Sequence, residues 1–346
     1  MKPLRVAVLG CGHLGKIHTR LLKSNPDVEL IGVVDPVAAS CEAISREFSV
    51  PALANHRELF GNIDAAVVAT PTRFHHAVTR DLLRNGIHAL VEKPITVTVD
   101  EADELISLAS RFERVLQVGH VERFNPSFVA VRKRLGQPRF IEAVRASGYT
   151  FRSTDIGVVL DLMIHDIDLV LTLADSLVVD VEALGTAVLG PHEDMAHARL
   201  KFANGCVANL NASRTSFVPQ RSMQIFTDRN FAAIDFAAGT AKLVTPDPRL
   251  IDKQLDVHQL PQEEKNHLKE HLFRDLLPIE ELTIEKGNAI QAEQQDFISA
   301  IRHQSQPQVT GSHGRAALAI ATEIAAQISA VRPAAFSSSF ERRKAA

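Results

Sequence analysis

The sequence predicts an α/β protein: a doubly wound parallel sheet followed by a second α/β domain with an open, mostly antiparallel sheet. Three observations predict it. The chain has 346 residues, enough for about two domains. Short apolar runs alternate with helical patterns up to residue 118, as in a parallel sheet. Beyond residue 123, alternating apolar and polar residues with hairpin signals take over. We therefore expect domains at 1–122 and 123–346.

The elements of the first domain follow one another in a regular rhythm. Each strand is a short β-branched or apolar run, and each helix has apolar residues at helical spacing. Asp100 offers an N-cap for the last helix of the domain. The expected strands are Arg5–Leu9, Val28–Val34, Ala65–Ala69, His88–Val91 and Val115–Val118, and the expected helices are Leu14–Ser24, Ala39–Phe48, Phe74–Asn85 and 100–111.

The second domain mixes helices with hairpins. Asn204-Gly205 and Asp228-Arg229-Asn230 separate alternating runs, which is typical of antiparallel pairs. Residues 246–285 are charged and show no clear period, so we expect an excursion there, and a frayed tail at 332–346. The expected helices are Pro126–Leu135, Leu160–Leu173, Ala289–Arg302 and Arg315–Val331, and the expected strands are Phe140–Ala146, Val178–Val188, Ala198–Phe202, Val207–Ser213, Met223–Thr227 and Phe231–Phe236.

Composition excludes several classes of partner. The 38 basic and 41 acidic residues give a net charge of −3, so no one-signed field attracts nucleic acid or an anionic membrane. The sequence has no apolar run of about 20 residues and no secretory signal, so we expect no membrane insertion and a cytoplasmic protein. Cys11, Cys41 and Cys206 are scattered and odd in number, which favours reduced thiols.

A glycine pattern lies between the first strand and the first helix. Residues without a Cβ allow a tight turn and close approach to a pyrophosphate, and helix N–H groups face the phosphates. Asp35 ends the second strand 20 residues after the last glycine, where a carboxylate meets ribose hydroxyls. Because Asp35 repels a 2′-phosphate, the pattern predicts NAD rather than NADP. The expected contacts are Gly10, Gly12, His13, Leu14, Gly15 and Asp35.

Three further residues suggest chemistry. Lys93 follows the fourth strand, and ligands of doubly wound sheets bind beyond the carboxyl ends of strands. Asp161 and His165 are four residues apart, so an α-helix would place them on one face. Beside NAD, this set predicts alcohol oxidation: His165 accepts the hydroxyl proton, Lys93 stabilises the alkoxide, and Asp161 supports the pair. Taken alone, each residue also fits a structural role.

Two loops complete the predicted site. We expect Thr70, Pro71, Thr72, His75 and Glu92 to border the cofactor with Lys93. Arg123 and Asn125 are expected to face the substrate, together with Arg152 and His165. His267 and His271 have ligand spacing but no third ligand, so no metal is expected.

Together these motifs resemble the glucose–fructose oxidoreductase / inositol dehydrogenase / MocA family. The likeness rests on the glycine loop, Asp35, the Thr-Pro segment with His75, and the motifs at 92–94, 123–126 and 161–165. It implies a Rossmann domain, NAD(P) dependence, Lys93, Asp161 and His165 as the catalytic trio, and homodimers or homotetramers formed through the C-terminal sheet. The sequence departs from the family at Thr72, often Asn, and at Met163, often Gly.

Within the family, residues 119–126 and 158–168 look most like the branch of UDP-N-acetylglucosamine 3-dehydrogenases. This likeness predicts oxidation of a sugar nucleotide at C3. Arg123, Arg145 and Arg152 flank the predicted catalytic helix and are candidates to pair with its diphosphate. A dehydrogenase of free sugars, inositol or dihydrodiols is an alternative, as is a catalytically inactive NAD-binding regulator, although a regulator has no chemical need of Lys93 and His165.

Overall fold

The computed structural model describes residues 2–151 and 156–330. The chain divides into two units, each described here by itself. The first comprises the residues up to Phe124 together with Gly287–Ala319, and the second comprises Asn125–Lys286 and the residues from Ile320 onward. Arg152 and the tail at 332–346 lie outside the described residues.

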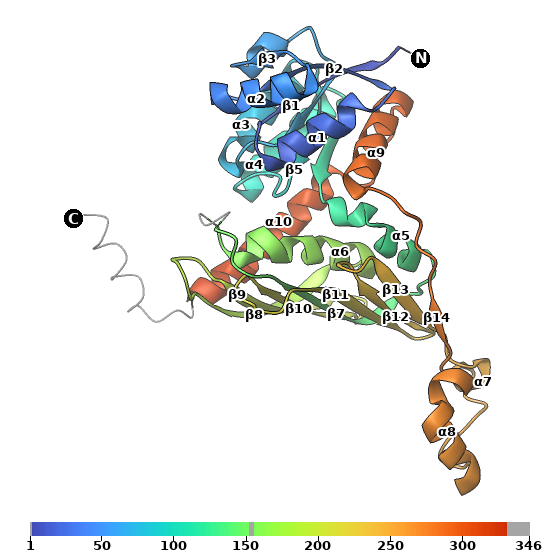
Figure 1. The fold of residues 1–346 in the computed structure, drawn as a ribbon. Coiled ribbons are helices and arrows are strands. Elements are labelled where there is room, and N and C mark those ends of the chain that lie inside the picture. Colours follow the sequence, from blue (N-terminus) through green and yellow to red (C-terminus); the bar gives the residue numbers. More distant parts are fainter. Residues whose placement is uncertain (1, 152–155, 331–346) are drawn as a thin grey trace. The chain divides into compact units, whose positions relative to one another are not determined.

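The first unit contains a six-stranded parallel sheet with the order β3-β2-β1-β4-β5-β6 (Figure 1). The order reverses between β1 and β4, which in doubly wound folds marks the ligand-binding edge. The strands are β1 (Leu4–Leu9), β2 (Val28–Val34), β3 (Ala52–Leu53), β4 (Ala65–Val68), β5 (His88–Glu92) and β6 (Leu116–Gly119). The predicted parallel sheet is confirmed, and β3 was not predicted.

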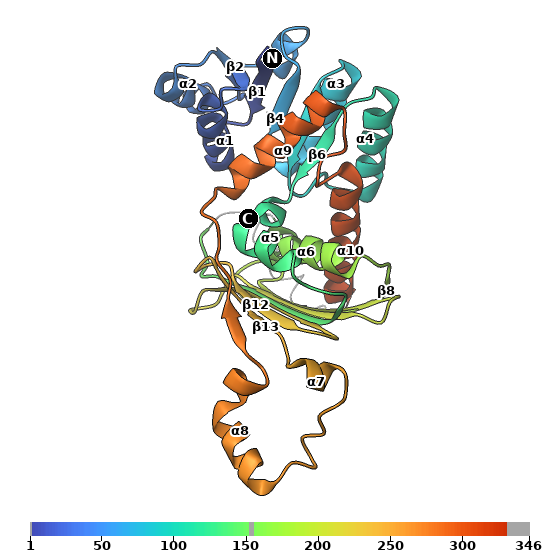
Figure 2. The same cartoon turned by 90° about the vertical axis from the view of Figure 1, so that its right-hand side faces the viewer.

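Helices cover both faces of this sheet. α1 (His13–Lys23) and α2 (Ala38–Phe48) lie on one face, and α3 (His75–Arg84) and α4 (Val99–Arg111) lie on the other (Figure 2). The predicted N-cap of α4 is wrong: Thr98 accepts from the Glu101 N–H, and Glu101 accepts from the Thr98 N–H. This reciprocal capping box satisfies two backbone donors, whereas Asp100 lies within the first turn.

A late segment of the chain completes the first unit. The sequence placed residues 287–319 in the second domain, whereas they pack with the first. Helix α9 (Ala289–His303) inserts Phe297 into the core that holds Val6 and Leu90, and Arg302 pairs with Asp27 at 2.6 Å. The apolar period of α9 predicts a helix but does not reveal which sheet it covers.

The second unit contains an eight-stranded sheet with the order β14-β13-β12-β11-β7-β10-β9-β8. Only the β7–β10 pair is parallel among the pairs described, so the predicted, mostly antiparallel sheet is confirmed. Both predicted hairpins form. The strands are β7 (Pro138–Ala146), β8 (Val178–Thr186), β9 (Met195–Phe202), β10 (Val207–Ser213), β11 (Gln220–Thr227), β12 (Phe231–Asp235), β13 (Thr240–Val244) and β14 (Ile279–Glu281).

Helices α5 (Pro126–Arg132) and α6 (Ile164–Ala174) lie along one face of this sheet (Figure 1). Burial alternates along the strands, so one face forms the core. Helix α10 (Gly311–Ala330) ends in this unit, where the Gln327 amide donates to the Val181 carbonyl. Within the described parts of the chain, no helix has the length and apolar character needed to cross a membrane.

The charged excursion forms an arm that extends beyond β13 and β14 (Figures 1 and 2). It contains the short α7 (Pro248–Ile251) and α8 (Gln262–Asp275), and no residue of α8 is buried. A helix without a buried face needs no apolar period. The sequence of the arm therefore gave no helical signal.

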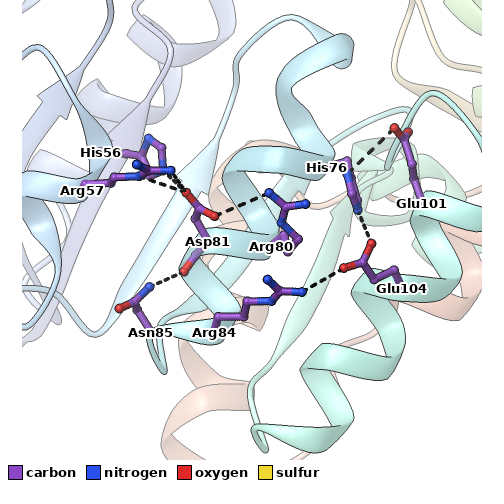
Figure 3. A network of polar contacts seen from close by, with 9 residues as sticks. All are labelled: His56, Arg57, His76, Arg80, Asp81, Arg84, Asn85, Glu101 and Glu104. Carbon is purple, nitrogen blue, oxygen red and sulfur yellow. Dashed lines mark hydrogen bonds and ion pairs between the residues drawn. The ribbon is translucent and has the colours of Figure 1, made fainter.

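A partly buried polar network holds α3 between its neighbours (Figure 3). On one side, Asp81 accepts from His56 and Arg57 at 3.3 and 3.0 Å. On the other side, Glu104 of α4 meets His76 at 2.8 Å and Arg84 at 3.3 Å. Exposed ion pairs contribute little to stability individually, but the network holds α3 from both sides.

His88 makes the stability of the first unit depend on pH. Burial, with the charge of Arg114, lowers the pKa of His88 to about 4, and its Nδ1 accepts from the Val115 N–H at 2.8 Å. Between pH 6.5 and about 4, the unfolded chain binds a proton at this site that the folded chain does not. The free energy of unfolding therefore falls as pH falls across this window.

Replacing His88 with Asn removes this titration. Between pH 6.5 and 4.5, calorimetry should show the wild type losing roughly 2–4 °C more in Tm than His88→Asn. The exposed His303→Asn is the matched control and should behave like the wild type. Equal losses in wild type and His88→Asn would contradict this prediction.

Candidate functional site

The glycine loop has the geometry that its sequence predicts. Gly10 has φ +102°, and a Cβ there would lie 2.4 Å from the Ala69 carbonyl oxygen. A Cβ at Gly15 would lie 1.8 Å from the Gly10 carbonyl oxygen, so the helix packs directly on the loop. At Gly12 a Cβ would meet no atom within 4 Å. Gly10 and Gly15 therefore shape the turn, and Gly12 faces open space.

Asp35 lies against this loop. Its Oδ2 accepts from the Cys11 N–H at 2.7 Å, and its Oδ1 accepts from the Val37 N–H at 2.8 Å. These bonds hold the carboxylate at the carboxyl end of β2, beside the glycine turn.

The residues around the loop fit a dinucleotide. Helix α1 has Gly12 at its N-cap position, no side-chain cap and no acidic residue in its first turn, so its N–H groups suit a phosphate. The Thr70 Oγ1 is buried and has no hydrogen-bond partner among the described residues. Leu14 and Val37 are exposed apolar side chains at the same edge, and His13 is exposed beside them. The flat aromatic rings of a dinucleotide pack against apolar side chains of this kind.

His75 is buried instead of facing the solvent. Its Nδ1 lies 2.8 Å from the Pro94 carbonyl oxygen, and its Nε2 lies 2.8 Å from the Thr70 carbonyl oxygen. A neutral imidazole has one N–H, so it donates to one of these two carbonyls at a time. Burial lowers the pKa of His75 although both carbonyls oppose the shift. Pro71 is exposed and Thr72 half-buried in the turn before α3.

Glu92 is also buried, whereas Lys93 is half-exposed at the carboxyl end of β5. The Glu92 Oε1 lies 2.9 Å from His18 Nε2, and its Oε2 accepts from the Lys93 N–H at 3.3 Å. Burial opposes ionisation, but the His18 hydrogen bond and the Lys93 charge hold the pKa of Glu92 below its ordinary value. The predicted cofactor ligand Glu92 thus directs its carboxylate to groups of the chain itself.

Glu293 is a functional candidate that the sequence analysis missed. Both of its carboxyl oxygens are buried and have no hydrogen-bond partner among the described residues. Burial, with the charges of Glu92 and Asp296, raises the pKa of Glu293 well above its ordinary value. Its backbone carbonyl accepts from Gln117 Nε2 at 3.0 Å. Because nothing in its local sequence marks Glu293 as buried, only the packing of α9 reveals it.

Asp161 and His165 lie in the second unit, and both are half-exposed. The predicted α-helix is wrong over Val159–Met163, where the backbone forms a π-helical turn before α6. The Ile164 N–H bonds to the Val159 carbonyl, five residues back. The four-residue rule therefore does not place Asp161, since a π turn closes over five. Such turns are frequent at functional sites.

Two of the arginines proposed from the sequence to bind a diphosphate, Arg145 and Arg123, have different partners in the structure. Arg145 is 4% exposed, and its Nε and Nη2 donate to Asp166 at 2.9 and 2.8 Å. Because Asp166 occupies the guanidinium group in this bidentate pair, the expectation that Arg145 binds a diphosphate is wrong. Arg123 is buried in the first unit and donates to the Gln308 carbonyl at 3.3 Å. Asn125 caps α5 by accepting from the Ser127 N–H at 3.0 Å.

The thiols are buried. Burial raises the pKa of Cys206 to about 11, and burial with neighbouring Cys41 and Asp35 raises the pKa of Cys11 further. Cys11 therefore fills the turn as a small residue and is not an acidified thiol. His267 pairs with Asp275 at 2.8 Å in the exposed arm.

The comparisons with known families match both units. Residues 4–120 match the family model described as "Oxidoreductase family, NAD-binding Rossmann fold", and residues 128–232 match "GFO/IDH/MocA C-terminal domain". These matches confirm the predicted oxidoreductase, its Rossmann fold and its NAD-type cofactor.

Individual relatives support the same family assignment. UDP-N-acetylglucosamine 3-dehydrogenase of Acidithiobacillus ferrooxidans is 34% identical over 335 residues, covering 94% of this chain and 98% of the relative. A solved structure of that enzyme has a TM-score of 0.84 at 34% identity, covering 95% of this chain and 99% of that one. The NAD⁺-dependent scyllo-inositol 2-dehydrogenase of Bacillus subtilis is 28% identical over 232 residues, covering 62% of this chain and 68% of the relative.

Solved structures at lower identity share the fold. Myo-inositol 2-dehydrogenase of Lactobacillus plantarum has a TM-score of 0.74 at 21% identity, covering 95% of this chain and 98% of that one. With both domain models matched and a relative above 30% identity along nearly its whole length, the chain belongs to the GFO/IDH/MocA family of NAD-binding oxidoreductases.

Proposed function

We propose that this protein oxidises the C3 hydroxyl of UDP-N-acetylglucosamine, with NAD as the hydride acceptor. The observation that carries the proposal is the near full-length similarity to a UDP-N-acetylglucosamine 3-dehydrogenase. The half-exposed Lys93, Asp161 and His165 provide the groups that such a reaction needs.

Each member of the trio has a separate role in the proposal. His165 accepts the proton of the C3 hydroxyl, for which an imidazole with an ordinary pKa near 6.5 is suited. Lys93 donates a hydrogen bond to the developing alkoxide and stabilises its charge. Asp161 supports the positive charge of the pair. When bound, NAD supplies a nicotinamide ring that takes the hydride released from C3.

The glycine loop and Asp35 hold the dinucleotide in this proposal. The uncapped N–H groups of α1 receive the pyrophosphate, and the Asp35 carboxylate accepts from the adenosine ribose hydroxyls. Thr70 Oγ1 gains a partner on the nicotinamide side. His13, Leu14, Pro71 and Thr72 line the same edge. For the substrate diphosphate, Arg123 and Arg152 remain candidate cations, with Asn125 beside Arg123 in sequence.

The test of substrate follows NADH absorbance with UDP-N-acetylglucosamine as substrate, and with L-glutamate and a sugar aminotransferase to convert the 3-keto product to a 3-amino sugar. A second reaction without the aminotransferase keeps the ketone. N-acetylglucosamine, glucose and myo-inositol run in parallel. We expect kcat/KM for the sugar nucleotide to exceed that for free N-acetylglucosamine by about 100-fold, since charge-assisted bonds to a diphosphate contribute several kcal/mol. Borodeuteride reduction of the product should place deuterium at C3.

Turnover of myo-inositol or glucose with none of the sugar nucleotide would overturn this assignment. It would favour the second candidate, a free polyol dehydrogenase, which the similarity to scyllo-inositol 2-dehydrogenase supports. Deuterium at another carbon would keep the substrate and reject C3. The proposal also predicts a cytoplasmic location and assembly into dimers or tetramers through the open sheet. Gel filtration and light scattering test the assembly.

A further inference from the structure

Two buried histidines contact the backbone segment that carries Lys93, one from each side. His18 on α1 is 0% exposed and His75 at the start of α3 is 1% exposed. His18 contacts Glu92, which precedes Lys93, and His75 contacts Pro94, which follows it. All these residues belong to the first unit.

The hydrogen bonds of His18 define which ring nitrogen carries the proton. The Gln294 amide nitrogen donates to His18 Nδ1 at 2.9 Å and to the His18 backbone carbonyl at 3.3 Å. The second bond fixes the amide orientation, because a carbonyl can only accept. Nδ1 is therefore an acceptor, and the Nε2 proton is donated to Glu92 Oε1 at 2.9 Å.

Glu92 connects His18 to the backbone of Lys93. With Oε1 held by His18, its Oε2 accepts from the Lys93 N–H at 3.3 Å. A Cβ on Gly119 would lie 2.9 Å from that Oε2, so Gly119 on β6 leaves just enough room for the carboxylate. The His18 hydrogen bond and the Lys93 charge hold the pKa of Glu92 low against burial, and His75 is the other titratable group that acts on it. Burial, with the charge of Glu92, raises the pKa of Glu293.

His75 fixes the other side. Its two ring nitrogens lie 2.8 Å from the carbonyl oxygens of Pro94 and Thr70, so the imidazole lies between the Lys93–Pro94 segment and the Thr-Pro turn and, when neutral, donates its one N–H to one of these carbonyls. α3 itself is held by the pair of Asp81 with Arg57 and the pair of Glu104 with His76 (Figure 3). His75 therefore contacts the segment from a helix that is anchored on both sides.

We propose that His18 and His75 are positioning residues that clamp the backbone on both sides of Lys93 and direct its ammonium group. The proposal rests on the catalytic role proposed for Lys93. Misplacement of a reacting group by about 1 Å costs about 100-fold in rate. The clamp thus affects turnover by fixing the position of the Lys93 ammonium group. The ionised Glu92 also favours the charged form of Lys93.

The central experiment compares His18→Leu, which removes the donor, with His18→Gln, which keeps an N–H near the Nε2 position. We expect kcat of His18→Leu to fall by about 10- to 100-fold with NAD affinity nearly unchanged, and His18→Gln to recover most of it. Because Glu92 loses its donor in His18→Leu, its pKa rises, and kcat should fall more steeply on the acidic side, as protonation of Glu92 adds to protonation of His165. A role that only stabilises the fold predicts no such change.

A second readout needs no turnover. In the chain without ligands, NMR of ¹³C-methylated lysines reports the surroundings of the Lys93 ammonium group through its resonance, assigned by its loss in Lys93→Arg. We expect that resonance to move toward those of exposed lysines in His18→Leu, since Glu92 no longer holds the Lys93 backbone in place. His75→Leu should lower kcat to a similar extent without the change on the acidic side of the profile that belongs to Glu92.

Matched variants make each outcome decisive. His88→Gln changes a histidine at the opposite end of β5 and should leave kcat and its pH profile unchanged. If His18→Leu does not fold, His18→Asn replaces it, since an asparagine amide is too short to reach Glu92. A folded His18→Leu or His18→Asn with wild-type kcat, pH profile and Lys93 resonance overturns the clamp.

Lys93→Ala separates the clamp from the proposed function. An inactive Lys93→Ala beside an unchanged His18→Leu rejects the clamp alone. A fully active Lys93→Ala rejects the role of Lys93 and the clamp with it.

Discussion

His165→Ala is expected to lower kcat by about 10²- to 10⁴-fold, because the C3 hydroxyl then has no positioned base to receive its proton. Lys93→Ala should lower kcat as well, through loss of the charge at the alkoxide. Both variants should bind NAD nearly as tightly as the wild type, since neither role concerns the glycine loop. Steady-state kinetics at saturating NAD, with NAD affinity measured by titration, check this.

The controls are an exposed histidine and an exposed lysine, His303→Ala and Lys133→Ala, which should keep wild-type turnover. Added imidazole should restore part of the activity of His165→Ala and none of that of Lys93→Ala. Near-normal turnover of His165→Ala across neutral pH would assign the proton transfer to another group.

Wild-type protein should bind NAD at least about 100-fold more tightly than NADP. The Asp35 carboxylate is held at the end of β2 by the Cys11 and Val37 N–H groups, so it cannot swing away from a 2′-phosphate without losing both bonds. An unrelieved like-charge contact of this kind costs several kcal/mol. Asp35→Asn removes the charge at constant size and should reduce the preference by about tenfold or more.

Calorimetric titration of both dinucleotides measures the preference. The control Asp103→Asn makes the same change at an exposed carboxylate of α4 that pairs with Arg315, and it should leave the preference unchanged. NADP binding equal to NAD binding by the wild type would show that Asp35 does not select the cofactor.

The sequence predicted elements best where local chemistry bounds them. β2 and β10 match their predicted limits to the residue, because turn residues stand at their ends. β3 has two residues, too few for any period, and α8 buries none of its side chains. Elements of these kinds leave no pattern from which a sequence analysis can start.

The candidate site was predictable where it follows a strand end or a glycine turn. Gly10, Gly15 and Asp35 belong to that class, since each is set by its own neighbours in sequence. The π turn at Val159–Met163 was not predictable, because its apolar residues fit an α-helix equally well. The partners of Glu92 and Arg145 come from distant segments, so their burial depends on tertiary packing alone.

Helix α9 has a consequence for synthesis of the chain on the ribosome. His18 and Gln294 are 276 residues apart, so the first unit waits for a segment made long after its own strands have emerged. At 5–20 residues per second, the interval between Phe124 and Ala319 lasts about 10–40 s. During that time the surface that receives Phe297 is open to chaperones and to other nascent chains. The unit whose strands are encoded first is thus completed only after most of the second unit has been made.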